Sequence, residues 1–217
     1  MKKILVAALC ILLLSLVNTK GFSQITDKDG ITYKTTIVGG RTWTAGNMKV
    51  THFKNGDKIM EAHNEAEWAK ANAEQTPAWC NYDYDSKFEK SLAKLYNWYA
   101  VTDPRGLAPE GWHIPTEQEW TSLSDSLGGE EVAGLKLKAD YGWLVYGTNE
   151  SGFSATPGGY VDKDGKFHQY PAVGYWWTST QYKDVGAFYR MLFASEPAIR
   201  RNANYKGCGY SVRAIMD

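Results

Sequence analysis

Histidine, cysteine and paired aspartates are the residues of this chain whose types could support metal, redox or hydrolytic chemistry. A zinc site needs histidine or cysteine ligands at short, regular spacing. The four histidines (His52, His63, His113 and His168) are scattered and share no such spacing. The chain also lacks the Gly-x-Ser-x-Gly turn of many hydrolases and the glycine-rich loop that binds phosphate. The sequence therefore predicts no catalytic residues, no metal site and no cofactor.

Three segments present alternating carboxylates that could bind calcium, at residues 27–30, 83–85 and 162–165. None of them continues into the twelve-residue loop, closed by a glutamate, that makes a calcium signal specific. The first and third segments read Asp-Lys-Asp-Gly, and aspartate followed by glycine is typical of tight turns. A solvated hairpin turn is therefore favoured over a calcium site.

A polar segment at residues 196–205 carries the groups best suited to recognise a ligand. It lacks the apolar alternation of its flanks at 189–193 and 210–215, so we expect an exposed loop between the last two strands. Arginine and asparagine form directional hydrogen bonds, and tyrosine can stack with little loss of entropy. A polar surface loop without a ligand is the alternative. The predicted ligand-binding residues are Arg200, Arg201, Asn202, Asn204 and Tyr205.

The amino terminus predicts the compartment. Lys2 and Lys3 precede an apolar stretch over residues 4–17, and small residues follow at positions 21 and 23, as in a cleaved secretory signal peptide. The stretch is shorter than the roughly 20 residues needed to span a bilayer. We therefore expect a signal peptide at residues 1–23 and an extracytoplasmic protein, secreted, cell-surface or periplasmic, without membrane insertion after cleavage.

The mature chain, residues 24–217, is predicted to form a single domain with a nearly balanced charge. Three of the 24 basic residues (Lys2, Lys3 and Lys20) lie in the signal peptide, which leaves 21 basic residues against 24 acidic ones. This balance argues against nucleic acid as a partner. We expect most of the nine tryptophans in the core, with one or two exposed to stack on a sugar.

Local residue patterns predict the helices, strands and turns of the chain. Alternation over residues 31–37, a Gly-Gly turn and a return over 41–44 indicate a β-hairpin. Asn64 and Thr116 are predicted N-caps of helices over 65–73 and 117–127, and Glu119 completes a capping box with Thr116. Residues 92–101 are ambiguous between helix and strand. Strands are expected at 153–154, 159–161, 175–180, 187–194 and 210–215, with a hairpin turn at 162–165.

The segment Gly111-Trp-His-Ile-Pro-Thr-Glu-Gln-Glu-Trp120 resembles the signature of the Fibrobacter succinogenes major paralogous domain family of secreted bacterial proteins. Further matching blocks lie on both sides, including Lys94-Leu-Tyr-Asn-Trp-Tyr-Ala-Val101, Gly174-Tyr-Trp-Trp-Thr-Ser179 and Gly209-Tyr-Ser-Val-Arg213. They keep their order from about Asp27 to Asp217. The resemblance covers essentially the whole mature chain and implies no particular activity.

Two of these blocks, at 114–120 and 209–213, are also similar to the C-type-lectin-like fold, which includes the formylglycine-generating (sulfatase-modifying) enzymes. The resemblance implies an α+β, C-type-lectin-like fold of two short helices, an antiparallel β-sheet and long loops. Such an enzyme would need two neighbouring cysteines to bind copper, whereas Cys80 and Cys208 are far apart in sequence. In an exported protein a disulfide between Cys80 and Cys208 is favoured, and two free thiols are the alternative.

The sequence thus favours a secreted, non-catalytic, lectin-like binding or cell-surface module whose partner is a glycan or a surface protein. The alternatives are a degenerate relative of the formylglycine-generating enzymes and a structural component of a surface assembly. Fold similarity alone does not decide between them.

Overall fold

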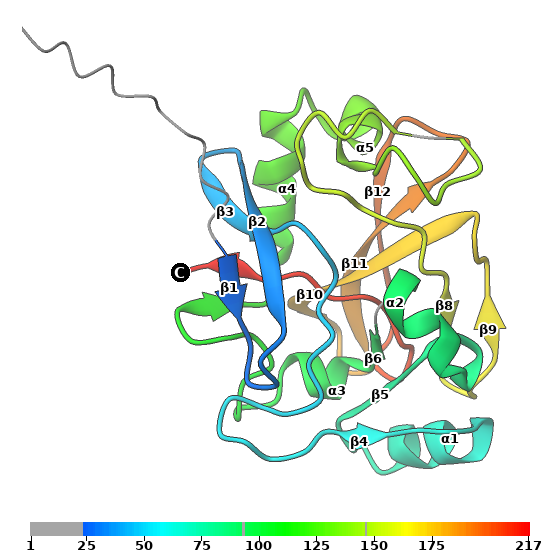
Figure 1. The fold of residues 1–217 in the computed structure, drawn as a ribbon. Coiled ribbons are helices and arrows are strands. Elements are labelled where there is room, and N and C mark those ends of the chain that lie inside the picture. Colours follow the sequence, from blue (N-terminus) through cyan, green and yellow to red (C-terminus); the bar gives the residue numbers. More distant parts are fainter. Residues whose placement is uncertain (1–23, 93, 146) are drawn as a thin grey trace, which may run out of the picture.

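The computed structural model describes residues 24–92, 94–145 and 147–217 (Figure 1). Within these ranges the chain is an α+β protein in which five short α-helices pack beside mostly antiparallel sheets. The predicted signal peptide, residues 1–23, lies outside the described residues. No helix in the described part of the chain is long and apolar enough to cross a membrane.

The largest sheet joins both ends of the described chain. Its order is β1 (Gln24–Thr26), β2 (Thr32–Val38), β3 (Arg41–Thr44), β13 (Ile215–Met216) and β7 (Trp112–His113). The predicted hairpin is β2–β3, with Val38 paired to Arg41. Gly39 and Gly40 between them have positive φ angles, which glycine adopts without steric cost.

The second sheet places the predicted ligand loop in a strand. Its order is β10 (Val173–Tyr182), β11 (Gly186–Phe193) and β12 (Ile199–Tyr205). The prediction that residues 196–205 form a loop is therefore wrong, because residues 199–205 pair antiparallel with β11 along their whole length. β12 is an edge strand of this sheet, and its polar side chains are compatible with that place because backbone pairing determines its conformation.

The last predicted strand is also corrected. Residues 210–215 alternate as a strand would, yet Tyr210 and Ser211 form isolated bridges to Tyr96 and Trp176. Regular pairing begins at Ile215 in β13. The segment passes through the core, where the polar residues Ser211 and Arg213 are as buried as Tyr210, Val212 and Ala214. Its apolar alternation therefore does not separate a buried face from an exposed one.

The two predicted helices are confirmed. α1 (Glu65–Ala73) is capped by the Asn64 side chain, which accepts a hydrogen bond from Glu67 N. α4 (Glu117–Ser126) begins with the complete capping box, in which Thr116 Oγ1 accepts from Glu119 N and the Glu119 carboxylate accepts from Thr116 N. These bonds satisfy amide groups that the first helical turn leaves without partners.

The helix α5 was not predicted. α5 (Glu130–Leu137) follows α4 directly, so the Gly128-Gly129 pair ends one helix and opens the next, with Gly129 as its N-cap. α5 packs against β12 (Figure 1). A side chain at Gly134 would lie 2.3 Å from the carbonyl oxygen of Ala198, so glycine permits this close approach.

The ambiguous segment 92–101 contains three short elements in succession. The elements are α2 (Glu89–Leu92), β6 (Leu95–Tyr96) and α3 (Trp98–Val101). Each is too short to establish a repeat, so the residue pattern fits neither the roughly 3.6-residue period of a helix nor the two-residue period of a strand. β6 pairs with β5 (Ala78–Cys80), and β5 pairs in parallel with β4 (Met60–Glu61). Two 3₁₀ turns at Tyr82–Tyr84 and Ser86–Phe88 connect β5 to α2. The predicted turn at 162–165 joins β8 (Tyr160–Val161) to β9 (Phe167–His168).

All nine tryptophans are buried, none more than 7 % exposed. The expectation that most of the tryptophans lie in the core is confirmed, and the expectation of one or two exposed indoles is wrong. Their burial is possible partly because indole N–H groups find backbone carbonyls: Trp98 donates to Thr178, Trp143 to Ala155 and Trp177 to Tyr96. A satisfied N–H removes most of the cost of burying this polar group.

Cys80 and Cys208 are both free thiols and both buried, so the predicted disulfide is not formed in this structure. They belong to different core clusters, Cys80 under α1 and Cys208 in the central cluster. Burial raises the pKa of the Cys208 thiol to about 12 and that of Cys80 well above its ordinary value. Neither thiol is poised to ionise near neutral pH.

The capping box should contribute measurably to stability. Replacing Thr116 by Ala removes one cap acceptor and should lower the free energy of unfolding by about 1 kcal/mol. Replacing Trp120 by Ala should lower it by about 3–5 kcal/mol, because the indole is only 1 % exposed. Urea unfolding measures both, with exposed Gln118→Ala on the same helix as the control. Curves that overlay the parent would contradict this packing of α4.

The thiol assignment can be checked under non-reducing conditions. Because thiolates are the reactive species, the folded protein should give almost no reaction with an aromatic disulfide reagent. After unfolding in guanidinium chloride, both Cys80 and Cys208 should react. If the unfolded chain still shows no reactive thiol, a disulfide exists and the packing around both cysteines differs from this description.

Candidate functional site

The acidic segments are turns whose carboxylates are already engaged. Asp27 Oδ1 accepts hydrogen bonds from Asp29 N and Ile31 N, and Asp162 Oδ1 accepts from Asp164 N and Lys166 N. Such bonds to the chain's own backbone are typical of aspartate in turns. This use of the oxygens supports the hairpin interpretation over calcium.

The histidines pair with separate carboxylates. His52 Nδ1 lies 2.5 Å from Asp29, His168 Nε2 lies 2.8 Å from Asp162, and His113 contacts both Glu119 and Asp217. Burial alone would raise the pKa of the Asp29 carboxyl, but hydrogen bonds from Thr51 and His52 lower it. Across the described ranges, no three His, Cys, Asp or Glu residues gather as metal ligands.

The predicted ligand residues on β12 are largely tied to their neighbours. Arg200 Nη1 lies 2.6 Å from Glu131 on α5, and Arg201 Nη1 lies 3.7 Å from Glu117 on α4. These ion pairs fix the strand to the helices. The amides are engaged as well: Asn204 Nδ2 donates to the Tyr210 hydroxyl at 2.8 Å, and Asn202 Oδ1 accepts from Ala203 N. Tyr205, at the end of the strand, is 54 % exposed.

Tyr205 lines a cavity at the end of β12, here called the Tyr205 cavity. Its volume is about 380 Å³. It lies between α1 and the end of β12. Tyr99 of α3 and the β8–β9 turn complete its lining on the other sides. Its lining combines two phenols, two amides and charged groups of both signs: Tyr99, Tyr205, Gln75, Asn72, Asp164, Asp184, Lys163 and Lys206. Of the five predicted ligand residues, the structure places Tyr205 in this lining.

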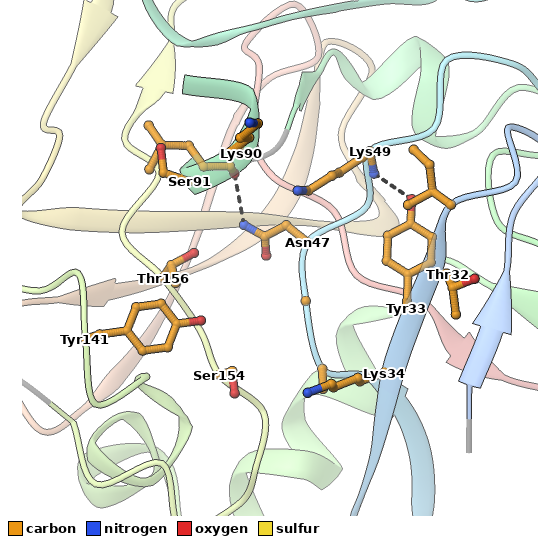
Figure 2. A pocket seen from close by; sticks show the side chains of 14 residues that line it. Thr32, Tyr33, Lys34, Asn47, Lys49, Lys90, Ser91, Tyr141, Ser154 and Thr156 are labelled. Carbon is orange, nitrogen blue, oxygen red and sulfur yellow. Dashed lines mark hydrogen bonds between the residues drawn. The ribbon is translucent and has the colours of Figure 1, made fainter. Parts of the chain in front are cut away.

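The second cavity, here called the lysine cavity, lies beside β2 (Figure 2). Its volume is about 260 Å³. Lys34 on β2, Lys49 after β3 and Lys90 on α2 line it together with the hydroxyl-bearing residues Thr32, Tyr33, Ser91, Tyr141, Ser154 and Thr156. The sequence analysis missed this site because its residues are spread from 31 to 156 and no motif links them.

Two buried arginines, Arg190 and Arg213, differ in the groups that their guanidiniums contact. Arg190 on β11 pairs with Glu117 at 2.5 Å and also with Glu130, so its charge is compensated by carboxylates from α4 and α5. Arg213 is fully buried and contacts neutral acceptors, with Nε 2.8 Å from Asn47 Oδ1. Arg190 thus pairs with two carboxylates, whereas Arg213 pairs with none in the described part of the chain.

Comparison with known proteins identifies one family. The Fibrobacter succinogenes major domain matches residues 37–216, nearly the full length of the described chain. Neither the comparison with curated proteins nor the comparison with solved structures gives a match.

Proposed function

The chain belongs to the Fibrobacter succinogenes major domain family, and we propose that it is a non-catalytic carbohydrate-binding module of the extracytoplasmic space. The proposed site is the Tyr205 cavity. The observation that carries the proposal is the exposed Tyr205 ring at a cavity that also presents amide and carboxylate groups. Ligand sites commonly combine an apolar or aromatic surface with a few directional polar groups.

The chemistry of the lining suits sugar hydroxyls. Tyr205 and Tyr99 offer ring faces for stacking, and each carries a hydroxyl that can donate or accept. Gln75 and Asp184 have side-chain oxygens that make no hydrogen bond or ion pair within the described ranges. An amide and a carboxylate with unused acceptors can each receive the O–H of a saccharide.

The wall of the cavity is held in place before any ligand arrives. Asn72 Nδ2 donates to Gly207 O at 2.7 Å and to Lys163 O at 3.0 Å, and Asn72 Oδ1 accepts from Asn97. These bonds link α1 to the β8–β9 turn and to the end of β12. A wall fixed in this way loses little conformational entropy on binding, which favours affinity.

The balance of charge favours a neutral ligand. Lys163 pairs with Asp164 at 2.6 Å, and the Lys206 ammonium lies 4.9 Å from the centre of the Trp98 ring. The cavity therefore has no large excess of either charge. A neutral glycan fits this arrangement better than a nucleic acid, and a surface protein is the alternative partner.

The lectin-like fold and the compartment belong to the same proposal. The fold rests on the helix entry at 114–120 and the closing segment at 209–213, and the compartment rests on residues 1–23. The runner-up is a degenerate formylglycine-generating enzyme. The separate burial of Cys80 and Cys208, with raised thiol pKa values, favours the non-catalytic alternative.

The proposal predicts that the protein expressed from Gln24 binds neutral glycans on a glycan array. Tyr205→Ala should weaken the strongest interaction by about fivefold, because one aromatic stacking contact is worth roughly 1 kcal/mol. Tyr182→Ala serves as the matched control, since Tyr182 is 40 % exposed on β10 and lines neither cavity. Titration calorimetry with the best glycan gives the affinities. Absence of glycan binding, or equal affinities of parent and Tyr205→Ala, would contradict the proposal.

A further inference from the structure

The lysine cavity brings together three positively charged side chains, and no carboxylate is among its described lining residues. The Lys34, Lys49 and Lys90 ammonium groups make no hydrogen bond or ion pair in the described part of the chain. By contrast, Lys54, Lys87 and Lys94 elsewhere in the molecule each lie within 4.0 Å of a carboxylate. In Figure 2, Lys34, Lys49 and Tyr141 extend from three separate segments toward the same space.

The nearby carboxylates are already occupied. Among the described residues, no Asp or Glu lines this cavity. Glu89, which lies within electrostatic range of Lys49, pairs with Lys94 at 2.8 Å. Asp27 accepts a short hydrogen bond from the Tyr33 hydroxyl and is 8 % exposed. Neither carboxylate is available to compensate all three lysines.

A fourth positive charge lies directly behind the cavity wall. Arg213 donates from Nε to Asn47 Oδ1 and from Nη2 to the carbonyl of Ser154, and both of these residues line the cavity. No carboxylate of the described residues pairs with its guanidinium. Burial lowers the pKa of Arg213 to about 9, because the charged form is disfavoured away from water. A buried, uncompensated cation raises the positive potential of the neighbouring cavity.

We propose that the lysine cavity is a second binding site, specific for an oxyanion group: a sulfate, a phosphate or a carboxylate. Three unpaired ammonium groups from separate elements and a buried guanidinium supply the attraction. This cavity shares no lining residue with the Tyr205 cavity. The anion and the glycan can therefore belong to different molecules.

The cavity also supplies hydrogen-bond donors for the oxygens of such a group. The hydroxyls of Tyr141 and Thr156 make no hydrogen bond within the described ranges, and both line the cavity. Lysine binds phosphate-like groups as a point charge with three donors. A volume of about 260 Å³ accommodates an oxyanion with a small part of the molecule that carries it.

The test is titration calorimetry of the protein with sodium phosphate, sodium sulfate and sodium glucuronate, at constant ionic strength set with sodium chloride. We expect saturable binding of at least one anion. The triple variant Lys34→Gln/Lys49→Gln/Lys90→Gln should lower its affinity at least about tenfold, which corresponds to about 1.4 kcal/mol. Strongest binding of glucuronate would identify a carboxylate ligand, and strongest binding of phosphate or sulfate would identify an ester of those acids.

The control has the same change in charge at exposed lysines outside both cavities, Lys58→Gln/Lys166→Gln/Lys183→Gln. It should bind the anion within about twofold of the parent, since these exposed ammonium groups do not line the cavity and salt screens exposed charges. Equal losses in the two triple variants would show a general charge effect and overturn the site. No binding of any of the three anions would overturn it too. Matching unfolding curves of both variants establish that folding is unchanged.

Discussion

The buried guanidinium of Arg213 is the interaction on which the arrangement of the elements depends. Its donors reach the carbonyls of Thr44, at the end of β3, and Phe153, in the segment before β8. They also reach Asn47 Oδ1, which accepts a second hydrogen bond from the Trp176 indole on β10. One planar group thus joins the amino-terminal hairpin, the middle of the chain, the second sheet and the carboxyl-terminal segment. Arginine suits this position because its five donors have a fixed geometry.

Both proposed sites follow from such joints between segments distant in sequence. The lysine cavity is bounded by Asn47 and Ser154, two residues that Arg213 holds. The Tyr205 cavity is bounded by Asn72, whose side chain links α1 to the end of β12. In each case one side chain that makes three or more hydrogen bonds links the segments around the cavity, and the lining also includes side chains without a polar partner in the described part of the chain. The residues proposed to contact ligands therefore lie at the periphery of the aromatic core, which supports them.

The sequence predicted the features that depend on contacts within a few residues. The caps at Asn64 and Thr116 and the turn after Asp162 are local bonds between a side chain and the nearby backbone. It did not predict β12, because pairing with β11 holds that strand without an apolar pattern. The lysine cavity was also missed, since Lys34 and Lys90 meet only in the folded chain. Tyr205 was predicted as a ligand residue on a loop; it lies at the end of β12 and lines a cavity, and its role in binding stays a prediction.

Urea unfolding of Arg213→Lys tests the central role of this residue most directly. Lysine keeps the positive charge but lacks the planar fork, so it leaves several buried carbonyls without donors. We expect the free energy of unfolding to fall by about 3 kcal/mol or more, as when a buried charge loses its partners. Arg200→Lys, at a partly exposed site on β12, should change it by no more than about 0.5 kcal/mol. If Arg213→Lys is as stable as the parent, the guanidinium does not organise the fold.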